Sequence, residues 1–130
     1  MKPPSLFLTL LVLCSSYAVA QDVRDSSGSL IGRISGTEVR SSNGSLLYRF
    51  DGNEIRTSHG SLYLRLDGAD IRSANGSLIG RFDGREVRSA NGSLMGKIEG
   101  TEVRSANGSL IGRVDGVSNR QAALFFFFLR

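Results

Sequence analysis

The sequence has one cysteine, one histidine and no apolar run long enough to cross a membrane as a helix. Cys14 lies within the first twenty residues, so the rest of the chain has no thiol for a disulfide. His59 occupies the asparagine position of a repeated turn, which predicts a turn residue and not a catalytic one. The glycines follow Asn or Asp in turns and open no helix, so no phosphate-binding loop is indicated. We therefore predict that the protein is not an enzyme and has no catalytic, cofactor-binding or metal residues.

The first twenty residues predict a secretory signal peptide. Lys2 supplies the charged start, Leu6 to Leu13 supply an apolar segment, and small residues up to Ala20 form a cleavage site before Gln21. We expect a secreted or periplasmic protein cleaved after Ala20. The alternative is a lipoprotein modified at Cys14, which the bulky Leu13 before it disfavours.

A sixteen-residue pattern occurs six times in tandem between residues 23 and 118. Each unit contains an Asn-Gly or similar pair and, eight residues later, an Asp-Gly or similar pair. Both pairs favour two-residue type I′ turns, in which both central positions need positive φ. The six residues between turns have the length of a strand. The chain thus predicts three segments: a signal peptide (1–20), a six-unit repeat of about twelve antiparallel strands (21–118) and an apolar C-terminal segment (119–130).

The expected hairpin register gives each strand one apolar and one charged face. Across Asn91-Gly92 and Glu99-Gly100 the type I′ register assigns one face to Val87, Leu94, Gly96, Ile98 and Val103. It assigns the other face to Glu86, Arg88, Met95, Lys97, Glu102 and Arg104. In this register Lys97 lies between Glu86 and Glu102. The alternative is a β-solenoid of sixteen-residue coils, which would stack the arginines of successive units as a like-charge ladder.

A long meander leaves two exposed edges, and closure into a ring removes them. Twelve strands give a ring with a lumen about as wide as one α-helix. The C-terminal segment is apolar on all sides from Ala122 to Leu129 and contains four consecutive phenylalanines. We predict that it forms a helix capped by Ser118 or Asn119 and plugs the ring, with an extended tail as the alternative. The inward glycines Gly32, Gly80, Gly96 and Gly112 would leave room for the rings, and Tyr48 and Leu64 would fill space that the tail does not reach.

The chain resembles the bacterial β-flower domains, small repeat domains named for four-fold or five-fold arrangements of hairpins. The residues that carry the resemblance are the half-units I-G-R-F-D-G-R-E and V-R-S-A-N-G-S-L, between Ile79 and Leu94, and the A-A-L-F-F-F-F run that starts at Ala122. The likeness covers nearly all of the chain after residue 20. It implies an all-β closed or radial hairpin-repeat fold and no particular activity. Six units here differ from four-fold or five-fold symmetry.

The outward arginines of successive units form a candidate binding belt, consisting of Arg56, Arg72, Arg88 and Arg104 with Tyr63 among them. Such a belt would suit an anionic glycan or another cell-envelope component. Nucleic acid is disfavoured, because removing Lys2 from the 16 basic residues leaves 15 against 12 interleaved acidic ones, a net charge of +3. The simpler interpretation is that arginine stems cover neighbouring apolar side chains.

Two further patterns follow from the turns themselves. The Asp-Gly carboxylates would share one rim, but their spacing is not that of a calcium loop. The Asn-Gly-Ser triplets formally match glycosylation acceptors.

Taken together, the signal peptide, the repeat and the lack of catalytic residues predict an exported, non-enzymatic structural or binding module. The alternative is a ligand-binding barrel or small hydrolase with a site in the lumen.

Overall fold

The computed structural model describes residues 21–129, and the predicted signal peptide with Cys14 lies outside this range. Twelve strands and one helix follow one another along the described chain. The strands are β1 (Gln21–Asp25), β2 (Leu30–Ser35), β3 (Glu38–Ser41), β4 (Leu46–Asp51), β5 (Glu54–Thr57), β6 (Leu62–Asp67), β7 (Asp70–Ser73), β8 (Leu78–Phe82), β9 (Glu86–Ser89), β10 (Leu94–Glu99), β11 (Glu102–Ser105) and β12 (Leu110–Val114). Helix α2 spans Asn119–Phe127.

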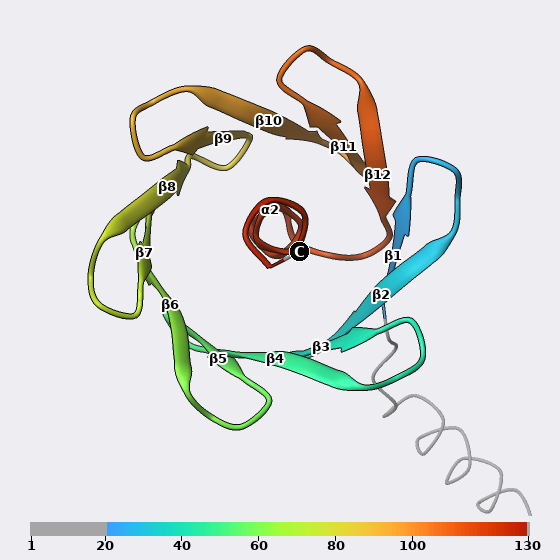
Figure 1. Ribbon diagram of the computed structural model, residues 1–130. Coiled ribbons are helices and arrows are strands. Elements are labelled where there is room, and N and C mark those ends of the chain that lie inside the picture. The colour runs from blue at the N-terminus through green and yellow to red at the C-terminus, as the bar shows by residue number, and fades with distance from the viewer. Residues whose placement is uncertain (1–20, 130) are drawn as a thin grey trace, which may run out of the picture.

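The strands form one closed antiparallel barrel in which each pairs with its neighbours in sequence and β1 pairs with β12 (Figure 1). Val23 lies opposite Val114 at the closing junction, so the ring has no unpaired edge. This confirms the predicted closed meander of hairpin repeats. It excludes the solenoid, whose coils would pair in parallel.

The Asn-Gly turns differ from the predicted type I′ geometry. In the hairpin of β9 and β10 the amide of Gly92 donates to the carbonyl of Ser89 (3.0 Å), and the amide of Ser89 donates to the carbonyl of Ser93 (2.8 Å). Gly92 has φ of 92°, whereas no residue other than glycine has positive φ in the described chain. These features define a type I turn followed by a glycine bulge, which places three residues in the loop instead of two.

The Asp-Gly turns also differ, because the glycine is the first central residue. Glu99 lies opposite Glu102, so Gly100 and Thr101 form the two-residue loop. Only Gly100 has positive φ, at 61°, which is the pattern of a type II′ turn. The predicted register is therefore wrong by two residues here, and Lys97 lies opposite Arg104 instead of Glu102.

The glycine bulge exchanges two side chains between the faces of β10. Gly96 lies opposite Val87, as predicted, but Leu94 lies opposite Arg88. Leu94 therefore shares the outer face with Arg88, and Met95 packs against the buried core. The predicted assignment of Leu94 to the inner face and Met95 to the outer face is wrong.

Helix α2 lies inside the ring of strands in Figure 1. Ser118, the N-cap, accepts a hydrogen bond through its hydroxyl from the amide of Gln121 (3.1 Å), which confirms one of the two predicted caps. Five helical residues are buried, from Ala122 to Phe126. Most of them belong to the same core cluster as inward strand residues such as Val39 and Val103, and Leu124 belongs to a second cluster with Ile55 and Ile71.

The four phenylalanine rings lie against the four inward glycines. A Cβ atom placed on Gly32 would lie 2.8 Å from the ring of Phe125. The corresponding distances are 2.4 Å between Gly112 and Phe126, 2.4 Å between Gly96 and Phe127, and 2.6 Å between Gly80 and Phe128. No residue larger than glycine fits at these positions while the rings stay where they are.

The two repeats without an inward glycine fill their space with their own side chains. Tyr48 and Leu64 stand at this position in β4 and β6, opposite Val39 and Ile55. Leu64 is 4 % exposed and packs in the cluster that contains Leu124. The lining of the ring is therefore asymmetric, because four repeats leave a hollow for a phenylalanine ring and these two do not.

Candidate outer-face site

Each predicted belt arginine is fixed by its own hairpin. Arg88 donates from Nη1 to the carbonyl of Gly92 (2.9 Å) and from Nη2 to Glu86 (2.9 Å). The equivalent contacts recur in all six hairpins, and we call the six residues the anchored arginines: Arg24, Arg40, Arg56, Arg72, Arg88 and Arg104. The glycine bulge explains the geometry, because it brings the glycine carbonyl within reach of the arginine four residues earlier.

A second basic residue lies directly opposite each anchored arginine. Arg81 pairs with Arg88 across the junction of β8 and β9, and Lys97 pairs with Arg104 across the next junction. We call the six residues in this position the flanking bases: Arg33, Arg49, Arg65, Arg81, Lys97 and Arg113. This opposition was not predicted from the sequence, because the expected type I′ register placed an acid opposite flanking bases such as Lys97.

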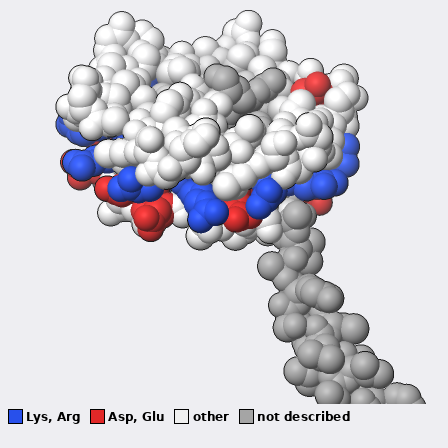
Figure 2. Space-filling model, turned by 60° about the horizontal axis from the view of Figure 1, so that its bottom comes forward, with Lys and Arg blue, Asp and Glu red and all other residues white. Residues whose placement is uncertain are grey.

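Each flanking base continues into a row of four paired residues that crosses the outer face. Asp70 lies opposite Arg81, Arg81 opposite Arg88, and Arg88 opposite Leu94. The same order of acid, base, base and leucine occurs six times within residues 21–129, and we call these the outer rows. On the side of the molecule that Figure 2 shows, Lys and Arg consequently form a band across the hairpins with the acids beside it.

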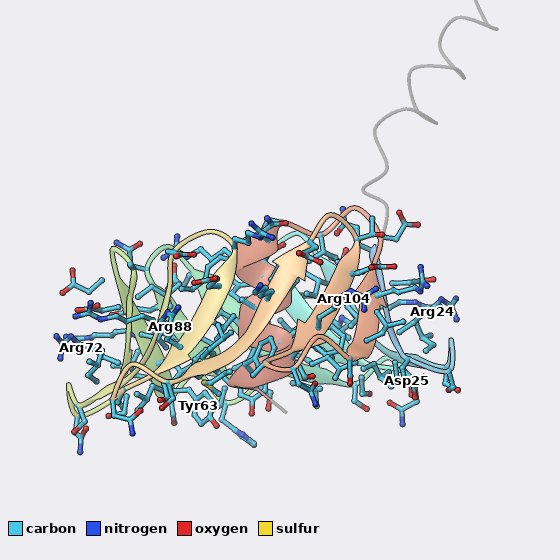
Figure 3. All side chains as sticks on the ribbon, turned by 90° about the horizontal axis from the view of Figure 1, so that it is seen from above. Arg24, Asp25, Tyr63, Arg72, Arg88 and Arg104 are labelled. Atoms are coloured by element: carbon cyan, nitrogen blue, oxygen red, sulfur yellow. The ribbon has the colours of Figure 1, made fainter. Side chains whose placement is uncertain are left out.

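Tyr63 lies apart from the anchored arginines. It is at the edge of the ring that also carries Asp25, the last residue of β1 (Figure 3). Its ring packs against that of Tyr48, with centroids 5.1 Å apart. Burial raises the pKa of the Tyr48 phenol above its ordinary value, and the nearby Tyr63 raises it further. Tyr63 and Leu47 are the large apolar side chains that the described residues leave exposed.

Shallow grooves lie where neighbouring hairpins meet. The groove at the junction of β4 and β5 has a volume of about 400 Å³ and is lined by Arg49 and Arg56 together with Thr37 and Asp51. Equivalent grooves at the junctions of β6 with β7 and β12 with β1 have volumes of about 280 and 330 Å³. Each contains one flanking base and one anchored arginine, so both bases of an outer row face the same hollow.

Two carboxylates of the Asp-Gly rim accept hydrogen bonds, Asp83 within its own turn and Glu99 from a neighbouring hairpin. The amides of Glu86 and Arg85 donate to Asp83 at 2.8 and 3.0 Å, and these bonds lower the pKa of its carboxyl below the ordinary value. A hydrogen bond from Arg85 (2.8 Å) likewise lowers the pKa of the Glu99 carboxyl below its ordinary value. Among residues 21–129 no group of three or more His, Cys, Asp or Glu side chains is placed to hold a metal ion.

Two indentations lie beside α2: a narrow one of about 20 Å³, lined in part by Ile71 and Phe82, and a larger one at the first turn of the helix. The larger one has a volume of about 180 Å³, and its lining includes Phe50, Leu66, Arg120 and Leu124. It is smaller than the roughly 300–1,000 Å³ of typical small-molecule sites. This indentation is the place where the alternative, a site in the lumen, would have to lie.

The closed ring of repeated hairpins with a C-terminal helix defines the class of the protein as a small all-β hairpin-repeat domain. The sequence model of the 5-fold beta-flower protein family matches residues 20–130, and the chain belongs to this family. No match to a curated protein or a solved structure was found. The ring has six hairpins, one more than the five-fold family description implies. No helix in the described part of the chain is long and apolar enough to span a membrane.

Proposed function

We propose that the protein is an exported, non-enzymatic module whose role is structural or binding and whose outer face meets its partner. The observation that carries the proposal is the use of the interior for packing. Phenylalanine rings occupy the hollows at the inward glycines, and the buried residues of the described chain are all apolar or glycine. The polar groups that repeat in every unit point outward, where a partner would contact them.

Membership of the beta-flower family fits a small structural domain. Export is proposed from the sequence, since the first twenty residues have the three parts of a signal peptide. The alternative, a ligand-binding barrel or small hydrolase, would need the lumen to admit a ligand beside α2.

Export is tested by expressing the full chain in a bacterial host and determining the intact mass of the product recovered outside the cytoplasm. We expect a chain that begins at Gln21 and has an unmodified amino terminus. A matched variant, Ala20→Leu, should accumulate uncleaved because the cleavage site needs a small residue. A lipid-modified chain beginning at Cys14, or a product that stays in the cytoplasm, would contradict the proposal.

The closed interior is tested by titrating the folded protein with indole, an apolar probe the size of one side chain. We expect no saturable binding by calorimetry or NMR, because neither indentation beside α2 has the volume of a typical small-molecule site. The variant Leu124→Ala serves as the positive control, since removing a side chain that is 1 % exposed enlarges the same space. Saturable binding to the unmodified protein would favour the lumen site instead.

A further inference from the structure

We propose that the six outer rows form a repeated binding surface for an anionic glycan, in which each pair of opposed bases takes one sulfate or carboxylate group. The inference deepens the binding role proposed above and rests on it. It arises from the observed register, which places bases opposite one another where the sequence pattern suggested alternating signs.

Directly opposed like charges in a sheet are destabilising. The ring contains six such junctions, from Arg24 opposite Arg113 to Lys97 opposite Arg104. A fold that repeats an unfavourable pair six times gains from an anion that binds between the two bases. The groove lined by Arg49 and Arg56 shows that there is space for such a group.

The acids of the rows neutralise only part of this charge. Glu38 contacts the anchored Arg40 at 2.7 Å and the flanking Arg49 at 3.9 Å, so one carboxylate serves two guanidinium groups. Asp22, Asp70 and Glu102 are shared between two arginines in the same way. The six rows hold six acids and twelve bases, which leaves one positive charge per row.

The two bases of a row contribute differently to an anion site. The anchored arginine is held by its acid and by a turn carbonyl, so little side-chain entropy is lost when it binds. Three flanking bases are more accessible than the anchored arginines: the side chains of Arg49, Arg81 and Arg113 are 56, 60 and 55 % exposed. Guanidinium groups bind sulfate-like and carboxylate oxygens through paired hydrogen bonds.

The arrangement favours a glycan over a nucleic acid. Single-stranded nucleic acids need aromatic side chains on which bases stack. The outer rows contain Arg, Lys, Asp, Glu and Leu only, and Tyr63 lies at the edge of the ring. A glycan needs no stacking surface, and the acidic groups of an anionic polysaccharide recur along its sugar chain. Several rows could thus bind one molecule, which raises the overall affinity.

The test uses heparin fragments of increasing length as the sulfated-glycan probe, titrated into the mature protein at several salt concentrations. The variant Arg65→Gln/Arg81→Gln removes two exposed flanking bases. The variant Arg85→Gln/Arg120→Gln removes the same net charge outside the rows, also from exposed positions. Thermal unfolding of both variants checks that the fold is intact.

We expect long fragments to bind more tightly than short ones, and the row variant to bind them about tenfold more weakly with a salt dependence shallower by roughly two contacts. The control variant should bind nearly as the unmodified protein does. Equal weakening in both variants, no saturable binding of heparin, or tighter binding of duplex DNA at equal salt would each overturn the proposal. These failures leave the exported-module role standing, because the mass and indole measurements test it separately.

Discussion

Phe126→Asp is expected to abolish the cooperative unfolding transition of the mature protein at neutral pH. Phe126 is 8 % exposed, lies in the main core cluster and packs edge-on against Phe125 with ring centroids 5.5 Å apart. Removing a buried phenylalanine costs about 3–5 kcal/mol. Burying a carboxylate in its place adds a further penalty of several kcal/mol. The sum is comparable to the whole stability of a small domain, about 5–15 kcal/mol.

The matched control is Arg120→Asp, which introduces the same side chain at an exposed position of the same helix. An acid in the first turn interacts favourably with the helix dipole. The free energy of unfolding of Arg120→Asp should therefore stay within about 1 kcal/mol of that of the unmodified protein. Both variants are compared by circular dichroism during thermal and urea denaturation. If Phe126→Asp unfolds at the same midpoint as the control, the helix does not plug the ring and the predicted role of the tail is wrong.

Much of the fold follows from the sequence, because the repeat constrains it at several levels together. The sixteen-residue period fixes the number of hairpins, and the alternation around Val87 and Val103 fixes the buried face. The inward glycines and the phenylalanine run match in number, and the structure brings each glycine against one ring. These predictions rest on packing volume, which the sequence determines directly.

The turn geometry could not be fixed from the dipeptides alone. Asn-Gly suits a type I′ turn, but Ser89-Ala90-Asn91-Gly92 also has the serine at the first and the glycine at the last position that a type I turn favours. The latter geometry is the observed one. Likewise Gly100 suits the first central position of a type II′ turn as well as the second of type I′. Each dipeptide favours its two possible turn types about equally, so strand pairing in the closed barrel determines which turn type forms.

The errors in register had unequal consequences. A shift of two residues at Glu99-Gly100 preserves which face each side chain occupies, so the buried face survived the error. The bulge inserts a single residue, so it exchanged Leu94 and Met95. The shift also replaced the expected contact of Lys97 with Glu102 by one with Arg104. The antiparallel ring was thus predicted correctly, although the expected alternation of opposite charges between neighbouring strands was wrong.

The candidate site was predictable only in part, for the same reason. The anchored arginines stand out by their period, but their bonds to the turn carbonyls depend on the bulge. The flanking bases are equally periodic, and only the true register reveals that they oppose the anchored arginines. Tyr63 was included because an outward strand position was assumed, whereas it packs against Tyr48 at the edge of the ring.

The contact between glycines and phenylalanines leads to a second prediction with a large effect. Gly32→Ala should destabilise the protein by about 1–3 kcal/mol, because the new Cβ would lie 2.8 Å from the ring of Phe125 and 3.0 Å from the carbonyl of Arg40. Gly112→Ala should cost more, since its Cβ would lie 2.4 Å from the ring of Phe126 and 2.6 Å from a backbone carbonyl. Urea denaturation of each variant measures the cost.

A double-mutant cycle then shows whether each ring belongs to one glycine. Phe125→Leu removes the ring that Gly32→Ala meets, so the two changes together should cost less than their sum by about 0.5–3 kcal/mol. Gly80 meets Phe128 instead, and Gly80→Ala combined with Phe125→Leu should be additive within about 0.5 kcal/mol. Additivity in both pairs would show that the rings do not occupy the glycine hollows. Coupling in the matched pair alone means that the glycine positions fix the rotation of the helix within the ring, because each ring then fits one hollow only.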